Sequence, residues 1–113
     1  MSDEGFIVVL VTVGSVEEAE AIAGELVRNR LAACVNRVGP VRSIYEWKGD
    51  LAQDDEYLLI IKARRNGFEA LATRIRSLHS YEVPEVIALP ITAGSEPYLA
   101  WLASGTSGVP LGG

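Results

Sequence analysis

Apolar residues follow one another almost without interruption in two stretches of the chain. Residues 6–13 read FIVVLVTV, and such a β-branched run of strand length is typical of a strand covered on both faces. Residues 56–64 read EYLLIIKAR and follow a long extended segment, 34–48, with a bend at 39–40. We therefore expect a central first strand, and a hairpin of 34–48 and 56–64 whose turn is the polar segment 49–55.

Two further segments place apolar residues at helical spacing. The first follows Ser15, with Glu18 three residues later as a capping box. The second follows Asn66, which we expect to cap that helix together with Glu69. The two apolar stripes are Val16, Ala19, Ile22, Ala23, Leu26 and Val27, and Phe68, Leu71, Ala72, Ile75 and Leu78. A last short helix is predicted after Ser95.

Residues 86–91 form a short apolar strand. Pro90 within it cannot donate to a ladder, so the strand lies at an edge or ends there. The order of elements predicts an α+β fold of the ferredoxin-like βαββαβ type, one antiparallel sheet with helices on one face, plus a C-terminal helix. We expect a single domain at 6–104, a flexible N-terminus at 1–5 and a flexible Gly/Ser-rich tail at 105–113.

This fold leaves one face of the sheet without helices. The long second strand carries Tyr45 and Trp47, which would expose apolar surface and an open edge in a single chain. Burial against other copies removes both problems. We therefore predict a homo-oligomer, for which a closed ring or trimer absorbs the edge strands symmetrically.

The composition argues against several classes of protein, among them proteins with a membrane-spanning helix. The 113 residues include 49% hydrophobic and 22% charged residues, as in a globular domain, and no apolar run approaches the roughly 20 residues of a membrane span. The acidic start lacks the features of a secretory signal, so we expect a cytoplasmic protein. A net charge of -5 disfavours nucleic acid as a partner. Cys34 is the single cysteine, which excludes an intrachain disulfide.

Candidate chemistry centres on His79, the one histidine. A nitrogen-containing divalent-cation site would need this imidazole, with Glu82 or Glu85 as oxygen ligands and other subunits or water completing the shell. Alternatively, His79 interacts with free carbonyls at a helix end, and both glutamates are solvated turn residues. Cys34 is favoured as buried filler rather than a ligand. Because GxxxxGK[ST], GxGxxG, CxxC and GxSxG are missing, we expect no enzymatic activity.

Four segments carry a family resemblance: LAACVN (31–36), SIYEWKG (43–49), LLIIK (58–62) and HSYEVPE (79–85). In order and spacing the chain resembles the CutA divalent-ion tolerance proteins from about Val8 to Leu102. The resemblance implies a ferredoxin-like subunit in a tight trimer, similar in outline to the PII signalling proteins. It also implies a role in tolerance of copper and other divalent cations, without an established catalytic reaction.

The chain departs from the family at two informative positions. Ser80 stands where proline is common, and Val11 stands where some members have a cysteine linked to copper binding. A copper site with that thiol therefore does not carry over. The favoured hypothesis is a trimeric copper or divalent-cation binding protein with His79 and Glu85 as the first residues to test. The alternatives are a PII-like signalling or scaffold trimer that binds a small metabolite or partner protein between subunits, and, with least support, a small ferredoxin-like enzyme.

Overall fold

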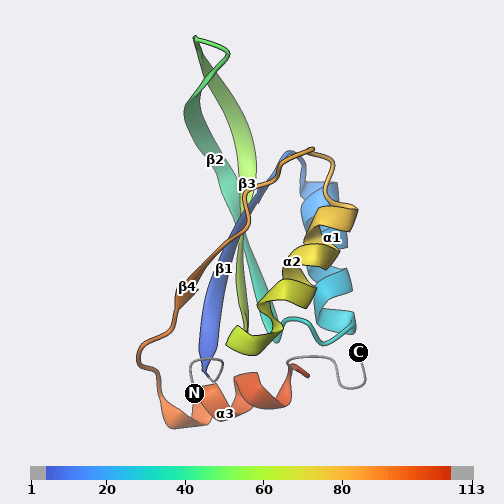
Figure 1. The fold of residues 1–113 in the computed structure, drawn as a ribbon, viewed down its shortest axis with the longest axis vertical. Helices are drawn as coiled ribbons and strands as arrows, with labels where there is room; N and C mark the ends of the chain where they lie inside the picture. Colours follow the sequence, from blue (N-terminus) through green and yellow to red (C-terminus); the bar gives the residue numbers. More distant parts are fainter. Residues whose placement is uncertain (1–4, 108–113) are drawn as a thin grey trace.

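The computed structural model describes residues 5–107 (Figure 1). The elements in this range are β1 (Phe6–Val13), α1 (Val16–Arg28), β2 (Cys34–Trp47), β3 (Asp50–Arg64), the 3-10 turn η1 (Arg65–Gly67), α2 (Phe68–Leu78), β4 (Ile87–Pro90) and α3 (Glu96–Ser104). This order confirms the predicted βαββαβ arrangement with a C-terminal helix. The division into a domain at 6–104 with flexible ends stays a prediction, since residues 1–4 and 108–113 lie outside the described residues.

Within the described residues the strands form one sheet in the order β2-β3-β1-β4. Every neighbouring pair is antiparallel, and β4 is an edge strand, which accommodates Pro90. Helices α1 and α2 cover one face of this sheet (Figure 1). β1 is central, as predicted, but only alternate residues of it are buried in the chain. The expectation that β1 is covered on both faces is therefore wrong for a single chain, because helices α1 and α2 both lie on one face of the sheet.

The core lies between the helices and the covered face. Val9, Val11 and Val13 of β1 are fully buried. From α1, the sequence stripe buries Ala19, Ile22 and Leu26; from α2 it buries Leu71, Ala72 and Ile75. These buried positions form the packed layer that positions the ends of β1 and α2. The last members of the two predicted stripes, Val27 and Leu78, lie in the final turns of their helices and are exposed, so the prediction that the whole stripes are core is wrong there.

The start of α1 agrees with the sequence and the start of α2 does not. The Glu18 N–H donates to Ser15 Oγ over 3.1 Å, which confirms Ser15 as the N-cap. Asn66, in contrast, lies inside η1, and α2 begins only at Phe68 after Gly67. The predicted Asn66 cap is wrong because the chain makes a tight 3-10 turn here before the helix proper.

The hairpin differs most from its prediction. β3 begins at Asp50, so residues 50–55 belong to the strand and do not form a turn. Lys48 and Gly49 both have positive φ, 52° and 87°, as in the two-residue turns that match the twist of paired strands. The predicted bend at Gly39–Pro40 is confirmed as a register shift between Val38 and Val41. The hairpin extends well beyond the rest of the sheet (Figure 1).

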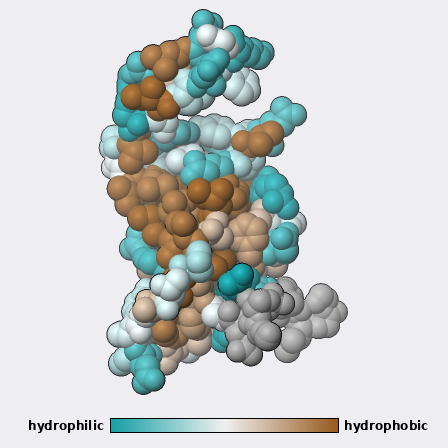
Figure 2. All heavy atoms as spheres, turned by 60° about the vertical axis from the view of Figure 1, so that its left-hand side comes forward, coloured by the Kyte–Doolittle hydropathy of each residue, from teal (hydrophilic) through white to brown (hydrophobic). Residues whose placement is uncertain are grey.

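The second face of the sheet is not covered by helices. Cross-strand register places Leu10, Ile60 and Ile87 on it together. We call it the bare face, and its apolar members are Val8, Leu10, Val38, Leu58, Ile60, Ile87 and Leu89. Apolar side chains form a broad patch on the side turned away from α1 and α2 (Figure 2). The sequence-based expectation of an apolar, helix-free face is therefore confirmed.

Candidate functional site

His79 caps the C-terminal end of α2 and points into the protein. Its side chain is fully buried, with Nε2 2.7 Å from the carbonyl oxygen of Thr12. Its Nδ1 accepts a 3.0 Å hydrogen bond from the backbone N–H of Tyr81. These partners assign the neutral tautomer with the proton on Nε2, which donates to Thr12. Both ring nitrogens are thus engaged inside one chain.

Glu18 fixes the residue that follows the histidine. One carboxylate oxygen of Glu18 accepts from the backbone N–H of Ser80 over 2.7 Å, and the other accepts from its hydroxyl over 2.9 Å. The same carboxylate lies 3.5 Å from His79 Nδ1. Proline could offer neither donor, so Ser80 replaces the stiffness of the common family residue with two hydrogen bonds to α1.

Tyr81 completes the cluster on the side of β3. Its hydroxyl donates to Glu56 Oε2 over 2.7 Å, and its ring centroid lies 4.6 Å from that of His79. Glu56 is only 8% exposed. The hydrogen bond to Glu56 raises the pKa of Tyr81 well above its usual value, with burial and nearby negative charges adding to the effect. Gly14 makes room, since a Cβ there would lie 3.3 Å from the Tyr81 hydroxyl.

These contacts join four parts of the chain. The end of β1, the first turn of α1, the start of the apolar part of β3 and the segment after α2 meet around His79. Sequence reasoning missed Glu18 and Glu56 as members of this cluster. In the sequence, Glu18 is recognisable only as part of a capping box, and Glu56 only as the start of an apolar run. Their partners lie 62 and 25 positions away, beyond the reach of local patterns.

The predicted ligands do not form a complete metal site within one chain. His79 is buried, whereas Glu82 and Glu85 are exposed on the segment before β4. Across residues 5–107, no three His, Cys, Asp or Glu side chains are grouped so that they could hold a metal ion. One chain therefore supplies a buried neutral imidazole, and exposed carboxylates that can bind a cation only with further ligands.

Cys34 lies at the start of β2, on the bare face beside Lys62 of β3. It is partly exposed, not the fully buried filler that the sequence favoured. Asn36 Oδ1 accepts a hydrogen bond from Lys62 Nζ and lies 4.0 Å from the Cys34 sulfur. These three side chains place a polar group on an otherwise apolar surface. No helix among the described residues is long and apolar enough to cross a bilayer.

Comparisons with known proteins agree with this fold. A family model described as CutA1 divalent ion tolerance protein matches residues 7–105. The "Divalent-cation tolerance protein CutA" of Thermus thermophilus is 50% identical over 99 residues, which is 88% of this chain and 96% of that protein. "Protein CutA, chloroplastic" of Arabidopsis thaliana is 50% identical over 100 residues, 88% of this chain but only 55% of that protein. The crystal structure of CutA1 from Oryza sativa superposes with a TM-score of 0.90 at 44% identity, covering 95% of this chain and 98% of that one. The chain therefore belongs to the CutA1 divalent ion tolerance protein family.

Proposed function

We propose that this chain forms a homotrimer that binds divalent cations, with copper as the first candidate, and serves cation tolerance without catalysing a reaction. The observation that carries this proposal is membership of a family described by divalent ion tolerance, over residues 7–105. The relative from Thermus thermophilus that bears this function in its name aligns over 96% of its own length.

The bare face supports assembly. It presents a continuous set of aliphatic side chains, and Ile87 and Leu89 on it are each about half exposed. The hairpin adds Trp47 and Leu51, which are 62% and 70% exposed. Apolar patches of this extent mark interaction surfaces, and burying them between identical sheets also covers the free edges of β2 and β4. A head-to-tail contact of this kind closes into a ring.

The proposed cation site uses Glu82, Glu85 and His79. The two exposed carboxylates offer oxygen ligands, and the segment that carries them is anchored at Ser80 by Glu18. His79 Nδ1 becomes a ligand only if it releases the N–H of Tyr81. The neighbouring subunits of the trimer complete the ligand set, which would explain why residues 5–107 of one chain contain no complete site. Copper favours sites that include imidazole nitrogen.

Calorimetric titration of metal-free protein with copper and then zinc tests the cation site. The variant Glu82→Gln/Glu85→Gln removes two charges while keeping side-chain size, and Glu96→Gln on α3 is the matched control. We expect saturable binding that weakens at least about tenfold, or 1.4 kcal/mol, in the double variant and is unchanged in the control. His79→Asn tests the imidazole, with circular dichroism confirming its fold. Absent or unaltered binding would overturn the direct cation role.

Light scattering after gel filtration tests the assembly. Three times the chain mass of 12.2 kDa is expected for the intact protein. Leu89→Lys, which places a charge on the bare face, should shift the mass toward that of one chain, whereas Val83→Lys, exposed on the preceding segment, should not. A monomer at every concentration would refute the trimer. Cytoplasmic location is part of the same proposal, and cell fractionation tests it.

A further inference from the structure

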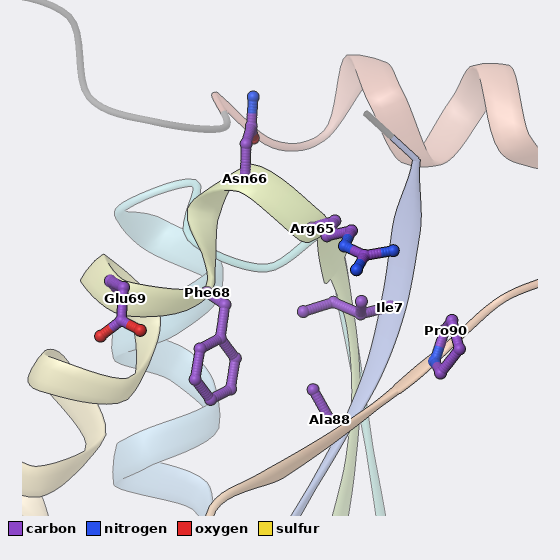
Figure 3. A pocket seen from close by; sticks show the side chains of 7 residues that line it. All are labelled: Ile7, Arg65, Asn66, Phe68, Glu69, Ala88 and Pro90. Atoms are coloured by element: carbon purple, nitrogen blue, oxygen red, sulfur yellow. The ribbon is translucent and has the colours of Figure 1, made fainter. Parts of the chain in front are cut away.

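A cavity of about 460 Å³ opens between the start of α2 and the edge strand β4 (Figure 3). Its floor and walls are apolar: Ile7 of β1, Phe68 of α2, and Ala88 and Pro90 of β4. The volume lies within the range of small-molecule sites, which are mostly apolar with a few polar groups. Arg65 and Asn66 of η1 and Glu69 of α2 complete its lining.

The polar groups at this cavity have a defined distribution. Arg65 lies at its upper rim, and in Figure 3 the guanidinium extends over Ile7 toward Pro90. The Arg65 side chain makes no ion pair or hydrogen bond with any residue in the range 5–107. Glu69 lies on the far side of the Phe68 ring. The Arg65 guanidinium is thus available beside the apolar floor, whereas the Glu69 carboxylate lines the other end of the cavity, beyond the Phe68 ring.

We propose that this cavity binds a small monocarboxylate with a compact aromatic or branched apolar body. The carboxylate pairs with Arg65, whose planar guanidinium suits two-point recognition of such a group. The body of the ligand packs between the Phe68 ring and the floor made by Ile7 and Ala88. Glu69 and the net charge of -5 oppose ligands with several negative charges, such as nucleotides, so a single charge is selected.

The cavity is separate from the proposed cation site and opens on the other side of the sheet from the bare face, although Ala88 and Pro90 belong to the edge strand β4 that the proposed trimer covers. Ile7 pairs with Pro90, and Val9 with Ala88, which places the cavity floor on the helix-covered side of the sheet. The bare face is the opposite side. Glu82 and Glu85 do not line the cavity. A negative result for the cation site therefore leaves this proposal standing, and the reverse also holds.

Titration of the full chain with benzoate, followed by amide shifts in ¹H–¹⁵N spectra, tests the proposal. We expect saturable shifts at Ile7, Phe68 and Ala88, with a dissociation constant on the order of 1 mM for so small a probe. Benzyl alcohol, which keeps the ring but lacks the charge, should bind at least about tenfold more weakly.

Two variants address the two halves of the site. Arg65→Gln should weaken benzoate at least about tenfold, because a hydrogen bond to a charged group is lost. Ala88→Leu should abolish binding by filling the cavity while keeping Arg65. Arg76→Gln, in the exposed last turn of α2, is the control and should bind like the parent. The proposal is overturned if these amides show no saturable shift, if benzyl alcohol binds equally well, or if neither Arg65→Gln nor Ala88→Leu weakens binding.

Discussion

The hydrogen bond between Tyr81 and Glu56 can be tested by removing its donor alone. Tyr81→Phe keeps the ring that packs against His79 but deletes the hydroxyl 2.7 Å from Glu56 Oε2. Hydrogen bonds to charged acceptors contribute about 1.5–3 kcal/mol. Tyr81 is 39% exposed, so water can reach part of the vacated space and compensate in part. We expect the free energy of unfolding to fall by about 1.5–2 kcal/mol, the lower part of that range.

Urea unfolding followed by circular dichroism measures this loss. All variants are compared at one protein concentration, since the stability of an oligomer depends on it. A double-mutant cycle with Glu56→Gln isolates the pair, with an expected coupling of about 1 kcal/mol because the glutamine keeps a neutral acceptor. Tyr98→Phe, at a tyrosine of similar exposure (42%), is the control and should change little. If the changes in the free energy of unfolding caused by Tyr81→Phe and Glu56→Gln add up in the double variant to within about 0.3 kcal/mol, the two side chains are not coupled and the proposed contribution of their hydrogen bond is refuted.

Three further outcomes follow from the structure. The pKa of Tyr81 is higher in the folded protein than in the unfolded chain, where it is about 10. The protonated hydroxyl therefore stabilises the folded state in full below about pH 10, and this contribution is lost as the pH rises through the pKa of the folded protein. Urea midpoints between about pH 9 and about pH 11 should thus fall more steeply for the parent than for Tyr81→Phe. Ser80→Pro removes both hydrogen-bond donors to Glu18, whereas Ser80→Ala removes only the hydroxyl. In thermal melting, the free energy of unfolding should therefore fall by about 1 kcal/mol more for the proline variant than for the alanine variant, although proline is common at this position in the family. Gly39→Ala should destabilise more than Gly49→Ala, since both have positive φ but only the Cβ at 39 would meet a backbone oxygen at 3.0 Å; equal urea midpoints would contradict this.

Much of the fold could be predicted from local pattern. The capping box at Ser15 and the stripe through Ile22 and Leu26 specify α1, because helix caps and helical periodicity act over a few residues. The same local reasoning failed at Asn66, where a cap-like spacing occurs within a 3-10 turn. Local spacing thus shows that a helix is near but not where the first turn begins.

The hairpin shows why polarity was misleading. The polarity of Asp54 and Asp55 predicts a turn, but these residues pair across the strands with Ser43 and Arg42. Where a hairpin projects beyond the layered core, neither face is covered by the same chain. Polar residues are then as suitable for the strand as apolar ones, and the turn is indicated instead by Lys48–Gly49, whose backbone takes positive φ.

The candidate site could be only half predicted. The position of His79 near the end of α2 is local, and the sequence indicated it. Its partner Thr12 and the contact from Glu18 to Ser80 come from folding of the chain onto itself. The tautomer of His79 and the engagement of both ring nitrogens follow from these partners. A single sequence therefore indicates which residue is chemically distinctive but not whether its donor atoms are free.

The outer half of the β2–β3 hairpin has a consequence for how this protein behaves at different abundances. Two strands with no third layer are marginally stable in water, so in a solitary chain this part should unfold locally and exchange its amide hydrogens fastest. Contact with other subunits would suppress this local unfolding. The amide protection of the hairpin would then depend on the extent of assembly. It would rise with protein concentration, whereas the amide protection of the helices would stay unchanged.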